Sequence, residues 1–182
     1  MPRILLCFCF LFASLASKSQ KYKPVDEGSK VHFIIKNFGI DTGGDLAGLS
    51  GDITFVPANI STSSFDVSVD VNTIDTDNDS RDGHLKRKEY FDAEKYPVIA
   101  IKSKKINRTN KSSSGWYHFT GTLTIRGVTK PIAFPFRATK KGDDYLFVGG
   151  FTINRLVFGV AIPSATISDN LKVSMSVLAK KS

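Results

Sequence analysis

The chain has 182 residues, of which 41% are hydrophobic and 11% aromatic, and its formal net charge is +8. That length leaves room for one domain with a sizeable core. Its two cysteines, Cys7 and Cys9, both lie near the N-terminus. A disulfide framework or a cysteine nucleophile in the rest of the chain is therefore excluded.

The N-terminus has the layout of a secretory signal peptide, residues 1–16. Arg3 precedes an apolar run over residues 4–16, which ends in small residues and is too short to span a bilayer as a helix. We expect cleavage after Ala16 and export of residues 17–182 as a soluble periplasmic or secreted domain. A retained membrane anchor is the alternative. Cys7 and Cys9 come early in the run after bulky residues, which argues against a lipoprotein.

The charge balance bears on partners. Without Arg3, 24 basic and 17 acidic side chains remain, a net charge of +7. The basic residues are scattered apart from three lysine pairs, and nucleic acid is a poor partner for an exported protein. Weak contact with an anionic membrane surface is one interpretation of the charge, and a solvated surface without a partner is the other.

After residue 30 the sequence alternates between apolar and polar residues. The runs cover residues 31–35, 65–71, 117–125, 132–136, 145–153 and 173–177. A period of two over so many segments is typical of half-buried antiparallel strands. Ordinary strand lengths give about eight or nine of them, and Gly127 and residues 142–144 suit hairpin turns. The sequence predicts an all-β domain, either a barrel or a sandwich.

One charged, aromatic-bearing insert, residues 82–97, interrupts this pattern. Residues 81–91 within it could form a short helix, with Leu85 and either Tyr90 or Phe91 on one side. Such an insert either covers an apolar opening or carries out chemistry.

A calcium site is not supported at the start of the insert. Asp75, Asp77 and Asp79 begin like a calcium-binding loop. The sixth and twelfth positions of that loop hold Ser80 and Lys86, where Gly and Glu are required.

A catalytic triad is not supported either. Ser80, Asp82 and His84 lie two apart on one loop, too close to flank an imidazole from both sides. No G-x-S-x-G motif occurs, and His32, His84 and His118 lack the spacing of metal ligands. We therefore expect no enzyme activity, no metal and no cofactor.

Three motifs resemble the YceI-like family, in the same order along the chain. They are D-G-H-L followed by Y-F-D-A-E-K-Y-P within residues 82–97, G-T-L-T-I-R-G-V-T-K-P at 121–131, and N-R-L-V-F-G at 154–159. The resemblance implies a lipocalin-like antiparallel β-barrel of about eight strands. In that family the barrel encloses a long apolar tunnel that holds an isoprenoid chain.

Strand alternation then supplies candidate residues for the tunnel wall. Ten of them share the apolar face of their strands: Phe33, Ile35, Phe55, Val69, Val71, Phe119, Leu123, Phe134, Phe136 and Phe151. The insert supplies a candidate cap over one mouth of the tunnel: His84, Leu85, Tyr90 and Phe91. A one-residue error in register would turn a whole strand over and misassign its residues together.

Three further positions carry hypotheses. Arg155 of the third motif could pair with Asp82 and tie the insert to the barrel, or it could be an exposed side chain without a partner. Asn37 stands where many members of the family have His, and Gly48-Leu49 replaces their G-x-F. If these positions shape the pocket, we expect a ligand that differs in length or head group.

The sequence thus predicts an exported protein that holds a polyisoprenoid or similar long apolar lipid for storage, transport or protection. Moving one isoprene unit from water into an apolar tube is favourable by on the order of 3–4 kcal/mol, so affinity should rise with chain length. A structural or envelope-stress protein with a solid core is the alternative. An enzyme acting on an apolar envelope substrate is a third reading.

Overall fold

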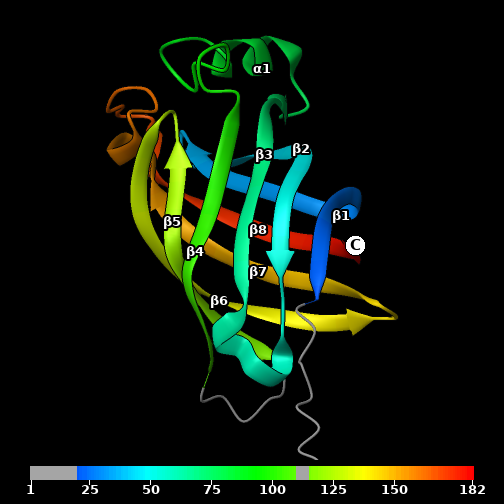
Figure 1. Ribbon diagram of the computed structural model, residues 1–182. Helices are drawn as coiled ribbons and strands as arrows, with labels where there is room; N and C mark the ends of the chain where they lie inside the picture. The colour runs from blue at the N-terminus through cyan, green and yellow to red at the C-terminus, as the bar shows by residue number, and fades with distance from the viewer. Residues whose placement is uncertain (1–19, 110–114) are drawn as a thin grey trace, which may run out of the picture.

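The computed structural model describes residues 20–109 and 115–182; the proposed signal peptide and its cleavage site lie outside them. Eight antiparallel strands form a closed barrel (Figure 1). Each strand pairs with its neighbours in sequence, and the last pairs with the first. The predicted all-β barrel is confirmed, and the sandwich is excluded.

The strands are β1 Lys21–Asn37, β2 Ile40–Thr54, β3 Ser64–Asp75, β4 Val98–Arg108, β5 Trp116–Ile125, β6 Val128–Lys141, β7 Asp144–Asn154 and β8 Ile167–Lys181. The longest connection between strands, residues 76–97, joins β3 to β4. Three short helices connect strands: η1 Pro57–Thr62, α1 Asp79–Leu85 and η2 Arg155–Phe158.

Strand β5 shows how the alternating pattern produces the inner face. Tyr117, Phe119, Gly121, Leu123 and Ile125 are buried, while the residues between them are partly or fully exposed. Successive side chains of a strand point to opposite faces, so one polar and one apolar face result. The β5–β6 turn consists of Arg126 and Gly127 with φ of 52° and 72°, the left-handed backbone that a tight two-residue hairpin turn needs.

One end of the barrel is filled by aromatic rings. This aromatic plug consists of Tyr22, Phe55, Phe65, Tyr117, Phe136, Tyr145 and Phe147. Phe55 at its centre is fully buried, and its ring lies 4.9–5.2 Å, centroid to centroid, from three neighbours in edge-on contacts. Helix η1 follows Phe55 directly and lies at this end of the barrel (Figure 1).

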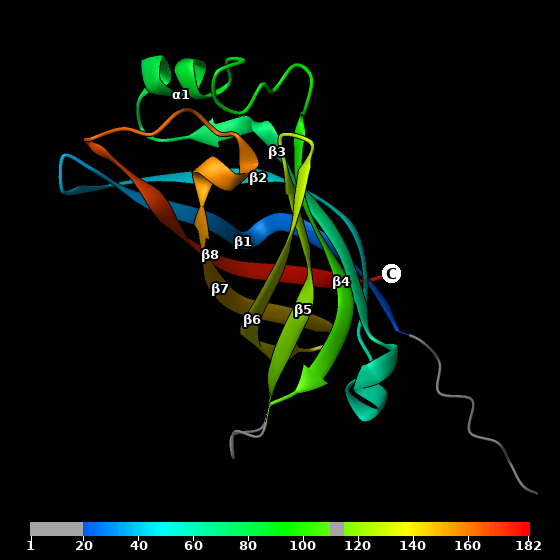
Figure 2. The same cartoon turned by 90° about the vertical axis from the view of Figure 1, so that its left-hand side faces the viewer.

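The opposite end is covered by residues 76–97, the lid, which connects β3 to β4 (Figure 2). Helix α1 in the lid begins after Asn78, whose side chain accepts a hydrogen bond from the Arg81 N–H, an N-cap. The helix ends at Leu85, so the expected helix over residues 81–91 is wrong at both ends. Beyond Leu85 the chain forms a series of turns, with a φ of 51° at Asp92.

Candidate apolar ligand site

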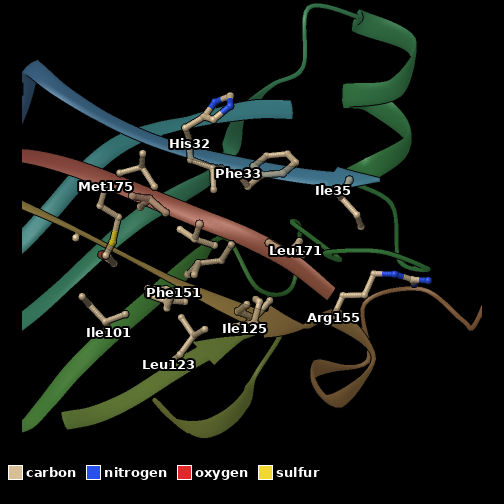
Figure 3. Close-up of a pocket in the computed structure, with 18 of the residues that line it drawn as sticks. His32, Phe33, Ile35, Ile101, Leu123, Ile125, Phe151, Arg155, Leu171 and Met175 are labelled. Carbon is tan, nitrogen blue, oxygen red and sulfur yellow. The ribbon is translucent and has the colours of Figure 1, made fainter. Parts of the chain in front are cut away.

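A cavity of about 260 Å³ lies inside the barrel, and all eight strands and the lid contribute to its wall. Figure 3 shows side chains from β4, β5, β7 and β8 converging on this space, with Arg155 at one end. The wall is almost entirely aliphatic and aromatic. Its volume is close to the lower limit of ordinary ligand pockets, roughly 300–1,000 Å³.

Seven of the ten candidate tunnel residues line this cavity. They are Phe33, Ile35, Val69, Leu123, Phe134, Phe136 and Phe151. They come from five different strands, so the barrel brings together residues more than a hundred positions apart in the chain. Whether they contact a ligand stays a prediction.

Phe55, Val71 and Phe119 do not line the cavity, and the prediction that they do is wrong. Phe55 belongs to the aromatic plug, and Phe119 is fully buried with its ring stacked on Phe134 at 4.8 Å. Val71 is buried where β3 meets the end of the lid, and its N–H donates to the Pro97 carbonyl. Alternation gives the face on which a side chain lies, but not its depth along the barrel.

Several wall residues were not proposed from the sequence: Leu46, Leu49, Ile99, Ile101, Ile125, Leu171, Val173, Met175 and Val177. Ile125 and the three from residues 173–177 lie on faces whose alternation was already clear. Leu46 and Leu49 lie on β2, where pairing with β3 shifts register twice between Asp45 and Ser50. Such bulges break the period of two, so alternation gives no signal there.

The cap prediction is only partly matched. The side chains of Leu85, Tyr90 and Phe91 line the same cavity. The Phe91 N–H donates to the Leu85 carbonyl at 3.0 Å. His84 is exposed and does not line the cavity. Its ring lies 4.6 Å from that of Tyr90, so it covers the outer side of a cap residue.

The three motifs meet at this covered end. Arg126 from the second motif donates to the Lys88 carbonyl in the lid, at 2.6 Å, and to the Gly159 carbonyl of the third motif. The Ala161 N–H donates to the Glu89 carbonyl of the lid at 3.0 Å. These bonds fasten the lid to the β5–β6 turn and to the loop after η2.

Asp82 has a different partner from the one expected. Its carboxylate is buried and accepts hydrogen bonds from the backbone N–H and the hydroxyl of Thr76. Arg81 donates to the hydroxyl and carbonyl oxygens of the same Thr76. Asp82 therefore holds helix α1 to Thr76, the first residue of the lid.

Arg155 is neither paired with Asp82 nor free on the surface, so both hypotheses about it are wrong. Its side chain is 5% exposed and donates to the carbonyls of Val160, Ile162, Ile167 and Ser168 and to the Asp169 carboxylate. A planar guanidinium can serve five acceptors at once. Arg155 thus holds residues 160–169, which lead into β8, against the end of the barrel.

The comparisons with known proteins agree with this architecture. The model of the YceI-like domain matches residues 22–179. The chain belongs to the YceI-like family. It is 31% identical over 150 residues to Protein YceI of Salmonella agona, covering 79% of this chain and 76% of that protein.

Two solved structures share the fold of this chain. Burkholderia cenocepacia BcnA superimposes with a TM-score of 0.78 at 25% identity, covering 85% of this chain and 98% of that one. A polyisoprenoid binding domain from Saccharophagus degradans superimposes with a TM-score of 0.69 at 15% identity, covering 88% of this chain and 98% of that one. The second likeness concerns the fold alone.

Within this YceI-like barrel, both departures from the family pattern reach the cavity. Asn37 at the end of β1 and Leu49 in β2 are part of its wall. Gly48, beside Leu49, has a φ of 70°, and its N–H donates to the Asp26 carboxylate. The positions that differ in sequence are therefore placed to affect a ligand.

A polar side-chain pair joins the neighbouring strands β1 and β2 of this YceI-like domain. His32 Nδ1 lies 2.6 Å from Asp45 Oδ1 on the neighbouring strand. Partial burial would raise the pKa of Asp45, but hydrogen bonds from His32 and Lys30 hold it below its usual range. Among the described residues no group of three or more His, Cys, Asp or Glu could hold a metal, and no helix is long and apolar enough to span a membrane.

Proposed function

We propose that this protein is an exported lipid-binding protein that holds a polyisoprenoid or a similar long apolar chain in its barrel. The observation that carries the proposal is the apolar cavity between the aromatic plug and the lid. The fold it shares with a structure named as a polyisoprenoid binding domain supports the same ligand class.

The energetics of such a site favour long ligands. Each isoprene unit that leaves water for an apolar wall gains on the order of 3–4 kcal/mol before the costs of ordering. The loss of translational and rotational freedom on binding is nearly the same for a short and a long ligand. Affinity should therefore rise with each added unit until the cavity is full.

A binding role is preferred over catalysis because the two buried charged side chains at the lid end of the barrel, Asp82 and Arg155, already have partners. The Asp82 carboxylate bonds to Thr76, and Arg155 bonds to the carbonyls of the loop before β8. Arg155 therefore has no free N–H for an oxyanion site, and Asp82 is held by Thr76 and does not line the cavity. We therefore propose no catalytic role for them.

The first test is to identify what the protein carries. The purified protein, made with its own leader, is extracted with organic solvent, and the extract is analysed by mass spectrometry. A stoichiometric lipid is the expected result. The delipidated protein is then titrated with geraniol, farnesol and geranylgeraniol, for which we expect a stepwise rise in affinity. Equal affinities for all three would overturn the proposal.

A substitution that fills the cavity with a larger side chain tests whether the ligand binds inside the barrel. Val173 lines the cavity and pairs in register with Phe33 on one side and Phe151 on the other. Val173→Trp should lower the affinity for geranylgeraniol at least tenfold while the protein stays folded. Lys172→Trp, on the exposed face of the same strand, should bind normally. Equal loss in both variants would place binding outside the barrel.

A lipid surface is the proposed source of the ligand. Phe38 and Ile40 at the β1–β2 turn are 75% and 71% exposed, and Ile162 in the loop after η2 is 79% exposed. The Phe38 N–H donates to Thr166, so the two apolar tips are adjacent. Phe38→Ser with Ile162→Ser should reduce sedimentation with phosphatidylglycerol vesicles, and unchanged sedimentation would contradict this route.

Fractionation of cells that express the full chain tests the proposed export.

A further inference from the structure

The cavity wall contains one buried polar atom without a partner. Asn37 is the last residue of β1 and lines the cavity. Its side-chain Oδ1 is the only buried side-chain nitrogen or oxygen in residues 20–109 and 115–182 that lacks a hydrogen bond. Buried polar atoms are nearly always hydrogen-bonded, and an unpaired one lowers the stability of the fold. Leucine would fill the same wall without that cost.

No side chain of residues 20–109 and 115–182 donates a hydrogen bond to this oxygen. Arg155, the most deeply buried charge of the lining, already has an acceptor for each of its five N–H groups. Arg81 donates through Nε and Nη2 to Thr76. The Asn37 oxygen can therefore accept a hydrogen bond from a group that enters the cavity.

The place of Asn37 in the barrel says which part of a ligand it would meet. It pairs with Ile40 and Ile167, next to the β1–β2 turn and at the start of β8, at the end of the barrel opposite the aromatic plug. The wall between Asn37 and the plug is apolar. A long ligand that enters chain first would leave its terminal group beside Asn37.

We propose that Asn37 is a head-group site, and that the lipid held in the cavity ends in a neutral hydrogen-bond donor such as a hydroxyl or a primary amide. The inference rests on the lipid-binding function proposed above and specifies the ligand class. A hydroxyl donates to the amide oxygen and can also accept from the amide nitrogen. Ethers, quinone carbonyls and fully ionised phosphates offer acceptors only. Thr42 also lines the cavity and adds a side-chain hydroxyl to the lining.

Two ligands that differ in whether the terminal oxygen carries a hydrogen or a methyl group test this proposal. Delipidated protein is titrated with geranylgeraniol and with its methyl ether, which has the same chain without the donor. We expect the alcohol to bind about tenfold more tightly, since a well-placed hydrogen bond contributes on the order of one decade in Kd. Asn37→Leu should remove this difference and leave the affinity for the ether nearly unchanged. Asn72→Leu, the same change at an exposed position of β3, should keep it.

The outcomes separate this proposal from the one on which it rests. Equal binding of alcohol and ether by the wild-type protein overturns the head-group site and leaves the lipid-binding barrel intact. Failure of both ligands to bind overturns the barrel function itself. Geranylgeranyl phosphate that binds more tightly than the alcohol, and loses that advantage in Arg81→Gln, overturns the neutral head group. A midpoint of thermal unfolding for Asn37→Leu at or above that of the wild type shows that the variant is folded.

Discussion

The two halves of this barrel are built from the same alternating strands and differ in whether their interior is filled. In the plug half, rings from five strands and from the segment after β2 pack together, several of them edge to face. In the other half the inward residues are mostly Val, Ile and Leu, and they enclose the cavity. A barrel of eight strands has an interior just wide enough for side chains to fill. The volume of the inward residues at each level therefore decides between a core and a pocket.

The contrast is sharpest for two phenylalanines on opposite sides of this boundary. Phe55→Ala in the plug should lower the free energy of unfolding by about 3–5 kcal/mol, because a fully packed ring is replaced by a void. Phe33→Ala in the cavity wall should cost only about 1–2 kcal/mol, since its ring already borders the cavity. Urea denaturation of both variants measures the difference.

Ligand binding should show the reverse order. Phe33→Ala enlarges the wall that a ligand contacts and should change chain-length preference, while Phe55→Ala should leave it unchanged as long as the protein is folded. Similar stability losses in both variants would mean that the two halves are packed alike.

Removal of the Arg155 guanidinium, which orders the lid end of the barrel, gives the next largest loss of stability. Arg155→Ala leaves four carbonyls and the Asp169 carboxylate without their donor and should cost about 2–3 kcal/mol. Arg155→Lys keeps the charge but not the five-donor fork, so it should recover only part of the loss. Thermal unfolding of the three proteins tests this, and a wild-type midpoint for Arg155→Ala would contradict the role assigned to Arg155.

The attachment of the lid can be weakened with little effect on the core. Arg126→Ala removes the bonds from the β5–β6 turn to Lys88 and Gly159 and should cost about 1 kcal/mol. Because the lid supplies part of the cavity wall, bound farnesol should dissociate several-fold faster. Stopped-flow displacement measures this rate. Lys130→Ala, exposed on the neighbouring strand β6, is the control and should exchange at the wild-type rate.

The smallest expected effect concerns pH at the outer face. The pKa of Asp45 is held below its usual range, despite partial burial, by hydrogen bonds from His32 and Lys30. A lowered pKa contributes stability above the unfolded value of about 3.9, and this stability is lost as the pH falls through the folded value. The contribution should be below about 1 kcal/mol, because both partners are partly exposed.

Thermal unfolding from pH 6 to pH 2.5 of the wild type and Asp45→Asn measures this effect. The wild type should be the more stable at pH 6, and the two midpoints should converge below pH 4. A constant difference over the whole range would show that the ionisation of Asp45 does not contribute.

Much of the inner face could be predicted from the sequence, because alternation survives wherever a strand pairs regularly. Leu123, Phe134 and Phe151 were placed correctly in the cavity wall for that reason. The β2 residues Leu46 and Leu49 were missed because bulges shift the register there. The partners of Arg155 and Asp82 could not be predicted, since motif spacing does not say which loop a side chain meets.

The amino-acid sequence by itself determined the class of fold, the family and the inward face of most strands. Each of these depends on local periodicity or on short motifs. Only the tertiary structure decided that Phe55 and Phe119 fill a core while Phe33 and Phe151 border a cavity. It alone showed that Asn37 has a buried oxygen without a partner. Depth along a barrel and hydrogen-bond pairing depend on which strands meet at each level, and that is set by closure of the whole sheet.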